Sequence, residues 1–126
     1  MSDLRVIVIG CGNMGSSHAR AYAAVEGFAL VGLVDRDEAR AKRLAAETGN
    51  PAVYTDMDVA MEQARPDVVC ICTYPDTHHA LVMKCLKAGK HVFVEKPLAQ
   101  TVAQAQEIAR TAHERKLKVV VGYILR

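Results

Sequence analysis

Short apolar runs alternate along this chain with longer stretches in which apolar and polar residues mix at helical spacing. The runs are rich in valine and isoleucine and predict six strands, at residues 4–9, 29–34, 53–54, 68–72, 91–94 and 118–123. The mixed stretches predict five helices between them, at residues 14–25, 38–48, 58–63, 77–88 and 102–114. Strand and helix therefore alternate throughout the sequence.

The longer predicted strands are continuous apolar runs, not alternations of apolar and polar residues. Strands of that kind are buried on both faces, as in a parallel sheet covered by helices. Turn signals separate the elements, as at Gly49-Asn50-Pro51 and Arg65-Pro66-Asp67. The pattern predicts an α/β fold, a doubly wound parallel sheet in a single domain.

Composition and charge narrow the choice of partners. The 126 residues are 51% hydrophobic and 24% charged, which is typical of one globular domain. The formal net charge is +2 without a block of like charges, so small molecules or proteins are expected as partners, not nucleic acid or a membrane surface. No run approaches the roughly 18 apolar residues of a membrane span. Residues 1–5 lead into a strand instead of a signal peptide, and a cytoplasmic protein is expected.

Four cysteines, at positions 11, 70, 72 and 85, show no CxxC spacing. Cys70 and Cys72 would face the same side of a strand, as a ligand pair would, but free thiols in the core are the favoured interpretation. No metal site is predicted. Cys11 stands near a predicted helix N-terminus, which would lower the pKa of its thiol and make it an oxidation site.

The first predicted strand ends in the motif Gly10-Cys11-Gly12-Asn13-Met14-Gly15. Three glycines at this spacing between a strand and a helix are typical of the Rossmann dinucleotide-binding fold. Gly10 permits the tight turn, Gly12 lets the backbone approach a pyrophosphate, and Gly15 lets the helix pack closely. The helix begins near Asn13 and Met14, and its first N–H groups would point at the phosphates.

The second predicted strand delivers Asp35 to its carboxyl end. A carboxylate there accepts the ribose hydroxyls of adenosine and repels a 2′-phosphate, so NAD is the expected cofactor. Arg36 follows immediately, and a guanidinium at that place could pair with the 2′-phosphate of NADP. A solvated loop charge, or a lid on the adenine, is the favoured role for Arg36, and NADP remains the alternative cofactor.

The fourth predicted strand leads into Thr73-Tyr74-Pro75-Asp76-Thr77-His78-His79. Ligands of parallel sheets bind at the carboxyl ends of the strands, so Thr73, Tyr74 and Pro75 are expected along the adenosine and pyrophosphate halves of the cofactor. For the two histidines, one ring packed under the sheet edge and the other solvated is the favoured interpretation. His78 is kept among the cofactor-binding candidates.

Glu95, Lys96 and Pro97 follow the fifth predicted strand. Lys96 could hold the nicotinamide ribose together with a substrate hydroxyl, exchanging a hydrogen bond as alcohol and carbonyl interconvert. Glu95 would pair with Lys96 or help to position the cofactor. As a spacing alone, these residues fit a capped turn equally well.

In this order the motifs resemble the glucose–fructose oxidoreductase, inositol dehydrogenase and rhizopine-catabolism family of NAD(P)-dependent oxidoreductases. The resemblance runs over the whole chain. It is carried by residues 10–15, His18, residues 33–35, 73–75 with His78, 88–92, 95–98, and 121–123 before Arg126. Tyr74 departs from the family's usual turn and alters the expected contact with the cofactor.

The resemblance implies a two-domain enzyme that moves a hydride between nicotinamide and a hydroxyl carbon of a sugar, cyclitol or related polyol. Lys96 would be its catalytic lysine, followed by a cis bond to Pro97. Residues 1–122 would form the dinucleotide-binding domain, and residues 123–126 would begin the connection to a C-terminal α+β domain that this sequence lacks. That domain would complete the acid–base site and mediate a homo-oligomer, so the chain alone is expected to bind cofactor and catalyse little.

Two other kinds of function share part of the pattern. A stand-alone nucleotide-sensing module would carry the glycine motif and Asp35, but it needs no lysine at the nicotinamide. A structural or assembly partner would have no use for three intact glycines and Asp35. Both interpretations are weaker than the oxidoreductase.

Overall fold

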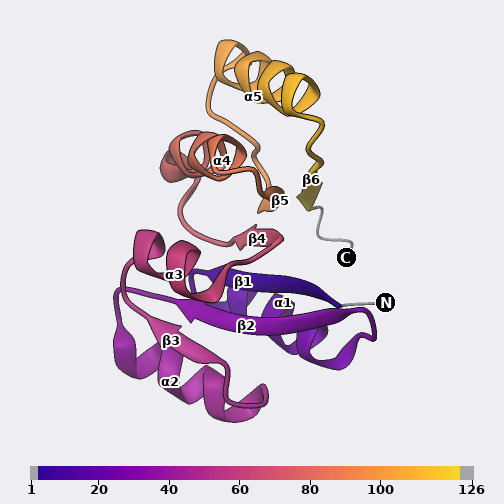
Figure 1. Cartoon of the computed structure of the whole chain (residues 1–126). Helices are drawn as coiled ribbons and strands as arrows, with labels where there is room; N and C mark the ends of the chain where they lie inside the picture. The colour runs from indigo at the N-terminus through magenta and orange to yellow at the C-terminus, as the bar shows by residue number, and fades with distance from the viewer. Residues whose placement is uncertain (1–2, 123–126) are drawn as a thin grey trace.

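The computed structural model describes residues 3–122 as one six-stranded sheet flanked by helices (Figure 1). The strands are β1 (Leu4–Ile9), β2 (Phe28–Val34), β3 (Ala52–Tyr54), β4 (Val68–Ile71), β5 (His91–Glu95) and β6 (Val119–Gly122). The helices are α1 (Asn13–Ala24), α2 (Glu38–Glu47), α3 (Met57–Ala64), α4 (His78–Lys87) and α5 (Val102–Arg115), with a short 3-10 helix, η1 (Pro75–Thr77), before α4.

All neighbouring strands are parallel, in the order β3-β2-β1-β4-β5-β6, which confirms the doubly wound sheet. The strand order reverses between β1 and β4, the place where such sheets bind their ligands. Element boundaries within the described residues differ from the prediction by at most one residue. The start of α4 moves to His78 because Pro75–Thr77 forms η1, and the predicted connection at residues 123–126 lies outside the described residues.

Alternate residues of β1 enter two separate cores. Val6 and Val8 pack in the layer between the sheet and helices α1 and α2. Ile7 and Ile9 pack in the opposite layer, beneath α3, α4 and α5. Since both layers are apolar, residues 6–9 form one continuous apolar run, and this explains why their sequence indicates burial on both faces.

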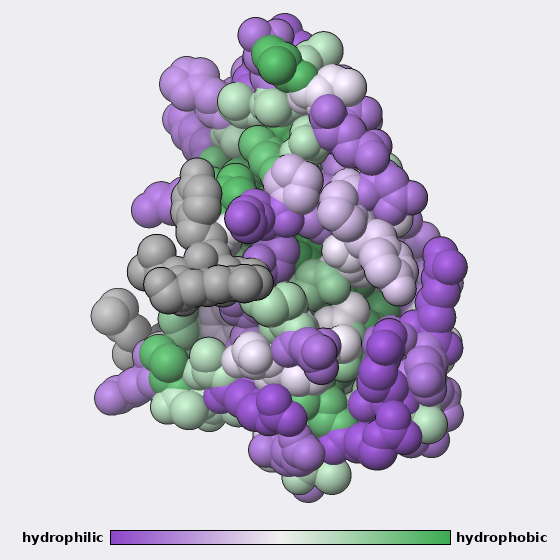
Figure 2. All heavy atoms as spheres, turned by 180° about the vertical axis from the view of Figure 1, so that it is seen from behind, coloured by the Kyte–Doolittle hydropathy of each residue, from purple (hydrophilic) through white to green (hydrophobic). Residues whose placement is uncertain are grey.

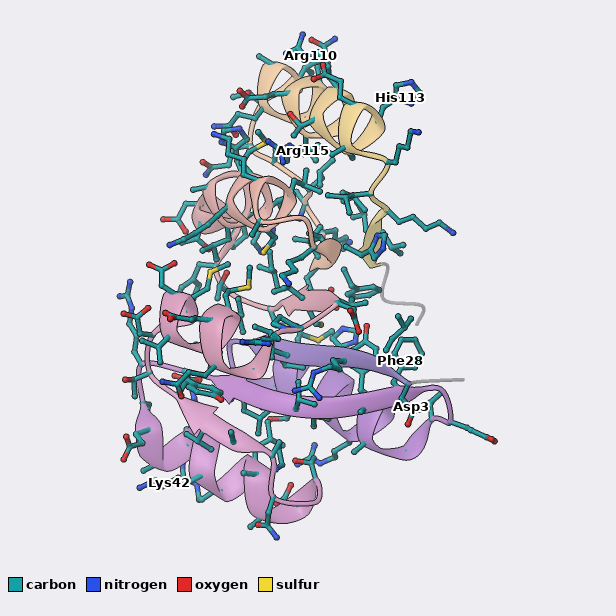
Figure 3. All side chains as sticks on the ribbon, in the orientation of Figure 1. Asp3, Phe28, Lys42, Arg110, His113 and Arg115 are labelled. Atoms are coloured by element: carbon teal, nitrogen blue, oxygen red, sulfur yellow. The ribbon has the colours of Figure 1, made fainter. Side chains whose placement is uncertain are left out.

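Polar and apolar residues are mixed on the surface of one face of the molecule (Figure 2). Hydrophilic residues cover much of the face shown in Figure 2, with hydrophobic residues between them. Lys42 stands on the outer side of α2 and Arg110 on the outer side of α5 (Figure 3). Within residues 3–122, no helix combines the length and the apolar character that crossing a membrane requires.

The turn from β1 into α1 is packed without room for side chains. Gly10 has a φ of +93°, a conformation that favours glycine, and a Cβ on it would lie 2.5 Å from the carbonyl oxygen of Cys72. A Cβ on Gly15 would lie 2.8 Å from the carbonyl carbon of Gly10 and overlap its oxygen. This close approach fixes the first turn of α1 against the ends of β1 and β4.

Gly15→Ala should therefore destabilise the domain, by about 2–4 kcal/mol, because the added methyl group meets backbone atoms that cannot rotate away. Gly12→Ala is the matched control. The nearest atom to a Cβ on Gly12 is Arg40 Nη1 at 4.0 Å, and the φ of −75° suits alanine. Urea unfolding of the two variants measures the difference. Equal stability of Gly15→Ala and Gly12→Ala would contradict the contact between Gly15 and Gly10.

Candidate functional site

The residues that the sequence singles out lie in the turns that follow four parallel strands. The glycine motif follows β1, Asp35 follows β2, Thr73 follows β4, and Lys96 follows β5. Because the strands are parallel, these turns share the carboxyl edge of the sheet. They flank the reversal of strand order between β1 and β4, so the topology brings the predicted site residues to one edge.

The start of α1 can hold an anion. Gly12 is its N-cap residue, and no side chain caps the first turn. Asn13 is exposed and Met14 is half-buried at the first two helical positions, and the space beside Gly12 is open. Uncapped N–H groups at the positive end of a helix bind phosphates, and a backbone free of Cβ atoms lets a phosphate approach. This geometry fits the pyrophosphate of a dinucleotide.

The carboxylate of Asp35 is fully engaged within the protein. The backbone N–H of Cys11 donates to its Oδ2 at 2.9 Å, and the backbone N–H of Asp37 donates to its Oδ1 at 2.9 Å. The guanidinium of Arg40 adds a two-armed contact, Nε to Oδ2 at 2.9 Å and Nη2 to Oδ1 at 3.0 Å. The side chain of Asp35 is only 4% exposed, so the expected open carboxylate for ribose hydroxyls is not what the structure presents.

The surroundings of this loop also shift the pKa values of two of its side chains, Asp35 and Cys11. Burial raises the pKa of the Asp35 carboxyl, but the hydrogen bonds from Asp37, Cys11 and Arg40 outweigh it, and the pKa lies below its ordinary value. For Cys11 the balance is the opposite. Burial, and then the neighbouring Asp35 charge, raise the pKa of its thiol to about 12. The predicted lowering by a helix N-terminus is wrong, because desolvation of the thiol is the larger effect.

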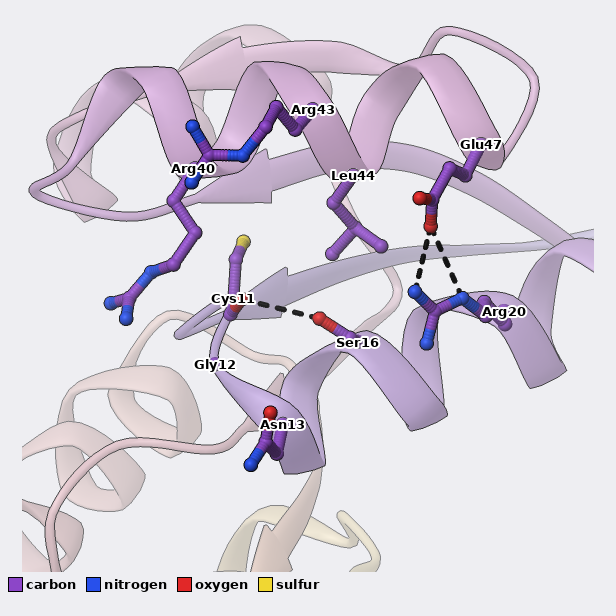
Figure 4. Close-up of a pocket in the computed structure, with 9 residues that line it drawn as sticks. All are labelled: Cys11, Gly12, Asn13, Ser16, Arg20, Arg40, Arg43, Leu44 and Glu47. Carbon is purple, nitrogen blue, oxygen red and sulfur yellow. Dashed lines mark hydrogen bonds and ion pairs between the residues drawn. The ribbon is translucent and has the colours of Figure 1, made fainter.

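A hollow of about 440 Å³ opens between α1 and α2, beginning at the glycine loop (Figure 4). Its wall carries three arginines, of which Arg20 pairs with Glu47 at 2.7 Å and Arg40 pairs with Asp35. Within residues 3–122, Arg43 forms no ion pair. The complete lining is Cys11, Gly12, Asn13, Ser16, Arg20, Arg40, Arg43, Leu44 and Glu47.

The turn after β4 is held by its own hydroxyl groups. The Oγ1 atoms of Thr73 and Thr77 are 2.7 Å apart, and the Thr77 hydroxyl donates to the carbonyl of Tyr74. Tyr74 is 80% exposed and Pro75 begins η1, so the phenol ring stands free beside the site. This arrangement is compatible with the predicted contacts of Thr73, Tyr74 and Pro75 to a cofactor.

His78 lies beneath this turn and is 1% exposed. Its Nδ1 is 2.6 Å from the carbonyl oxygen of Pro97, and its Nε2 is 3.0 Å from that of Thr73. The ring therefore joins the turns after β4 and β5, and both its nitrogens are engaged inside the protein. His78 is thus the packed ring that the favoured interpretation expected, and we correct its place among the cofactor-binding candidates to support of the two turns. His79, expected to be solvated, contacts Glu107 of α5 at 2.5 Å.

Glu95 contacts His18 of α1, not its neighbour Lys96. The ring of His18 also packs on Phe93, with centroids 4.8 Å apart. A Cβ on Gly122 would lie 2.7 Å from the Phe93 ring and 3.3 Å from Glu95 Oε1, so β6 approaches this cluster closely. The pair of His18 and Glu95 ties the end of β5 to the helix that follows the glycine loop.

Lys96 stands exposed at the carboxyl end of β5, and its bond to Pro97 is cis, in agreement with the family resemblance. Within the described residues, no ion pair joins it to an acid. Its ammonium is thus available to a ligand at the carboxyl edge. Arg36 is likewise exposed in the turn after β2.

Sequence reasoning assigned no role to His18 or Arg40. A signal existed for both. His18 is three residues beyond Gly15, hence on the same face of α1. Arg40 follows Asp37, whose side chain caps α2 by accepting from the Arg40 N–H, and a capped first turn directs Arg40 back toward Asp35.

The cysteines are free thiols, as predicted, and Cys70, which is fully buried, lies with its Sγ 3.6 Å from that of Cys72. In the part of the chain that the structure describes, no three histidine, cysteine or acidic side chains gather as a metal site would require.

The chain matches known proteins over nearly its whole length. Residues 4–123 match the family model described as "Oxidoreductase family, NAD-binding Rossmann fold". D-glucoside 3-dehydrogenase of Escherichia coli is 37% identical over 123 residues, covering 97% of this chain and 34% of that protein. Inositol 2-dehydrogenase 1 of Saccharopolyspora erythraea is 39% identical over 129 residues, covering 98% of this chain and 37% of that protein.

The fold also resembles that of a solved structure with bound NAD. GenD2 from gentamicin A biosynthesis, crystallised in complex with NAD, superposes with a TM-score of 0.92 at 34% identity, over 97% of this chain and 35% of that one. The named relatives are oxidoreductases, which does not support the nucleotide-sensing alternative. The chain spans about a third of the length of the curated relatives it matches. It belongs to the oxidoreductase family with an NAD-binding Rossmann fold.

Proposed function

We propose that this domain binds NAD across the carboxyl ends of β1, β2, β4 and β5, in a protein that oxidises a hydroxyl carbon of a sugar, cyclitol or related polyol. The observation that carries the proposal is the start of α1, where Gly10 and Gly15 close the turn and Gly12 leaves an uncapped, open approach. The substrate class follows from the relatives, which are named as glucoside and inositol dehydrogenases.

The glycine loop would bind the pyrophosphate through the N–H groups of Asn13 and Met14 at the positive end of α1. Thr73, Tyr74 and Pro75 would line the path of the cofactor on the far side of the strand reversal. The residues after β2 would meet the adenosine ribose. These contacts bind the dinucleotide without taking part in the reaction.

Lys96 would act at the other end, beside the reacting carbon. Bound nicotinamide supplies the hydride acceptor or donor for this chemistry. Oxidation of an alcohol also removes a proton from oxygen, and an amine at that oxygen can hold or move the proton. The contact between Glu95 and His18 keeps the neighbouring carboxylate off Lys96 and positions the turn, so we assign Glu95 and His18 to support of the lysine.

Gly12→Ala should weaken NADH binding by at least roughly tenfold, because the added methyl group occupies the approach of the phosphates to α1. Its stability should stay close to that of the parent chain, because the backbone conformation of Gly12 suits alanine and the added Cβ would meet open space. Titration of NADH into this chain by calorimetry measures the affinity. Ser17→Ala, on the exposed side of the same helix, is the control and should bind normally. Unchanged affinity in Gly12→Ala would place the dinucleotide elsewhere.

Lys96→Ala should lower turnover by ~10²-fold or more in the full-length protein, as expected for a lost acid–base or positioning group. NADH affinity should fall far less, because the pyrophosphate and adenosine contacts lie at other strands. The measurement is NAD⁺ reduction with a panel of inositols, aldoses and glucosides, beside a titration of NADH. Lys118→Ala, an exposed lysine at the amino end of β6, is the control. Turnover equal to that of the control would leave Lys96 as a turn residue.

A further inference from the structure

Two cysteine side chains, two residues apart in sequence, touch each other beside the glycine loop. Cys70 belongs to β4 and is fully buried, and Cys72 follows the end of that strand and is half-buried. Their Sγ atoms are 3.6 Å apart. Both side chains lie in the apolar layer between the sheet and helices α1 and α2. The domain thus holds a dithiol at the reversal of strand order, and the proposed reaction does not use it.

Cys72 packs against the two glycines that close the turn from β1 into α1. A Cβ on Gly10 would lie 2.5 Å from the carbonyl oxygen of Cys72, and a Cβ on Gly15 would lie 3.5 Å from the Cys72 Cβ. The backbone N–H of Cys72 also donates to the carbonyl of Ile9 at 2.8 Å. Because these contacts leave no slack, a movement of Cys72 would displace the turn that precedes the phosphate-binding end of α1.

A disulfide between the two thiols requires such a movement. The sulfur atoms of a disulfide are about 2.05 Å apart, so the two Sγ atoms have to approach by roughly 1.5 Å. Residues two apart in a strand have Cα atoms separated by about 6.6 Å, near the upper end of the ~4.4–6.8 Å range of disulfides. Cys70 is held in the sheet between β1 and β5 (Figure 1), whereas Cys72 lies beyond the last residue of β4. The bridge would therefore form by moving Cys72.

The two thiols differ in access and in acidity. Cys70 is 0% exposed, so an oxidant in solution reaches the half-buried Cys72 first. The hydrogen bond with Cys72, and then burial, raise the pKa of the Cys70 thiol above its ordinary value, and this thiol keeps its proton. Cys72 is thus suited to react first, and Cys70 to react second and supply a proton.

Hydrogen peroxide can oxidise such a pair in two balanced steps. Cys72 sulfur attacks one peroxide oxygen, so that an S–O bond forms, the O–O bond breaks and one water leaves, which converts Cys72 to a sulfenic acid. Cys70 sulfur then attacks Cys72 sulfur, so that the S–S bond forms and the S–O bond breaks. The Cys70 proton leaves with the hydroxyl group as a second water. The two thiols together lose two electrons, which the peroxide gains.

We propose that Cys70 and Cys72 form a reversible disulfide with peroxide as the oxidant, and that this disulfide weakens dinucleotide binding by displacing the turn between β1 and α1. The inference rests on the proposed function, because its readout is the binding of NADH at the glycine loop. A bridge between residues two apart in a strand is strained, and strained disulfides are readily reduced by other thiols. The modification therefore couples cofactor binding to the redox state of the surroundings.

The test is calorimetric titration of NADH into this chain before and after treatment with hydrogen peroxide, with peptide mapping of the product. We expect two of the four free thiols to be lost, and the peptide that contains Cys70 and Cys72 to be lighter by two hydrogen atoms. NADH affinity should fall by at least roughly tenfold. Dithiothreitol should restore both the thiols and the affinity.

Cys72→Ala should bind NADH like the reduced parent chain and keep that affinity after peroxide, because Cys70 then has no partner. Cys72→Ser, which is closer in size to cysteine, serves if Cys72→Ala does not fold. Cys85→Ala is the matched control. Cys85 is a buried thiol of α4 in the opposite core layer, and without it the chain should lose NADH affinity on oxidation as the parent does.

The remaining outcomes count against the proposal in different ways. Four free thiols after peroxide, or a bridge from Cys72 to Cys11, would overturn the pairing. A bridge between Cys70 and Cys72 that leaves NADH affinity unchanged would overturn its effect on the turn. An equal loss of affinity in oxidised Cys72→Ala would assign the effect to another cysteine. Absence of NADH binding by the reduced parent chain would overturn the proposed function itself, and the coupling with it.

Discussion

Gly15 and the carbonyl group of Gly10 lie so close together that only a residue without a Cβ fits at the first turn of α1. This contact determines where α1 begins and how it leaves the sheet. The helix starts uncapped at the carboxyl edge, beside Cys72 at the end of β4, and so faces the reversal of strand order. His18 follows one turn later on the same face of the helix, within reach of Glu95. Displacing α1 would therefore disturb the end of β5 as well as the phosphate loop.

Two buried carboxylates also connect neighbouring elements at the carboxyl edge of the sheet. Asp35 links the glycine loop to α2, and Glu95 links α1 to β5. A buried charge is stable only when its hydrogen-bonding capacity is satisfied, and within residues 3–122 no buried side-chain polar atom lacks a partner. Truncating Arg40 or His18 would leave the buried carboxylate of Asp35 or Glu95 with fewer hydrogen bonds, a cost that exceeds the net worth of the pair. The edge is thus held in one arrangement before any ligand arrives, which favours tight binding.

The sequence predicts the sheet and the loop because their requirements are local. Strands such as Leu4–Ile9 are apolar on both sides, and a glycine is needed wherever backbone approaches backbone. Side-chain partners are harder to predict. Glu95 and Lys96 are adjacent in sequence, but the residue that Glu95 contacts, His18, is 77 residues away. For Cys11, the sequence shows the helix N-terminus that lowers the pKa of a thiol but not the burial that raises it.

Cofactor selectivity illustrates the same limit. An acid after β2 indicates NAD only if its charge faces the ribose, and sequence position does not specify what covers it. At Asp35 the decisive neighbour is Arg40, which a helix cap at Asp37 brings back over the carboxylate. The pair exposes the Arg40 guanidinium and not the Asp35 carboxylate, although the residue at the expected position is acidic. The acidic residue type read from the motif therefore does not by itself specify which side chain is exposed at this place.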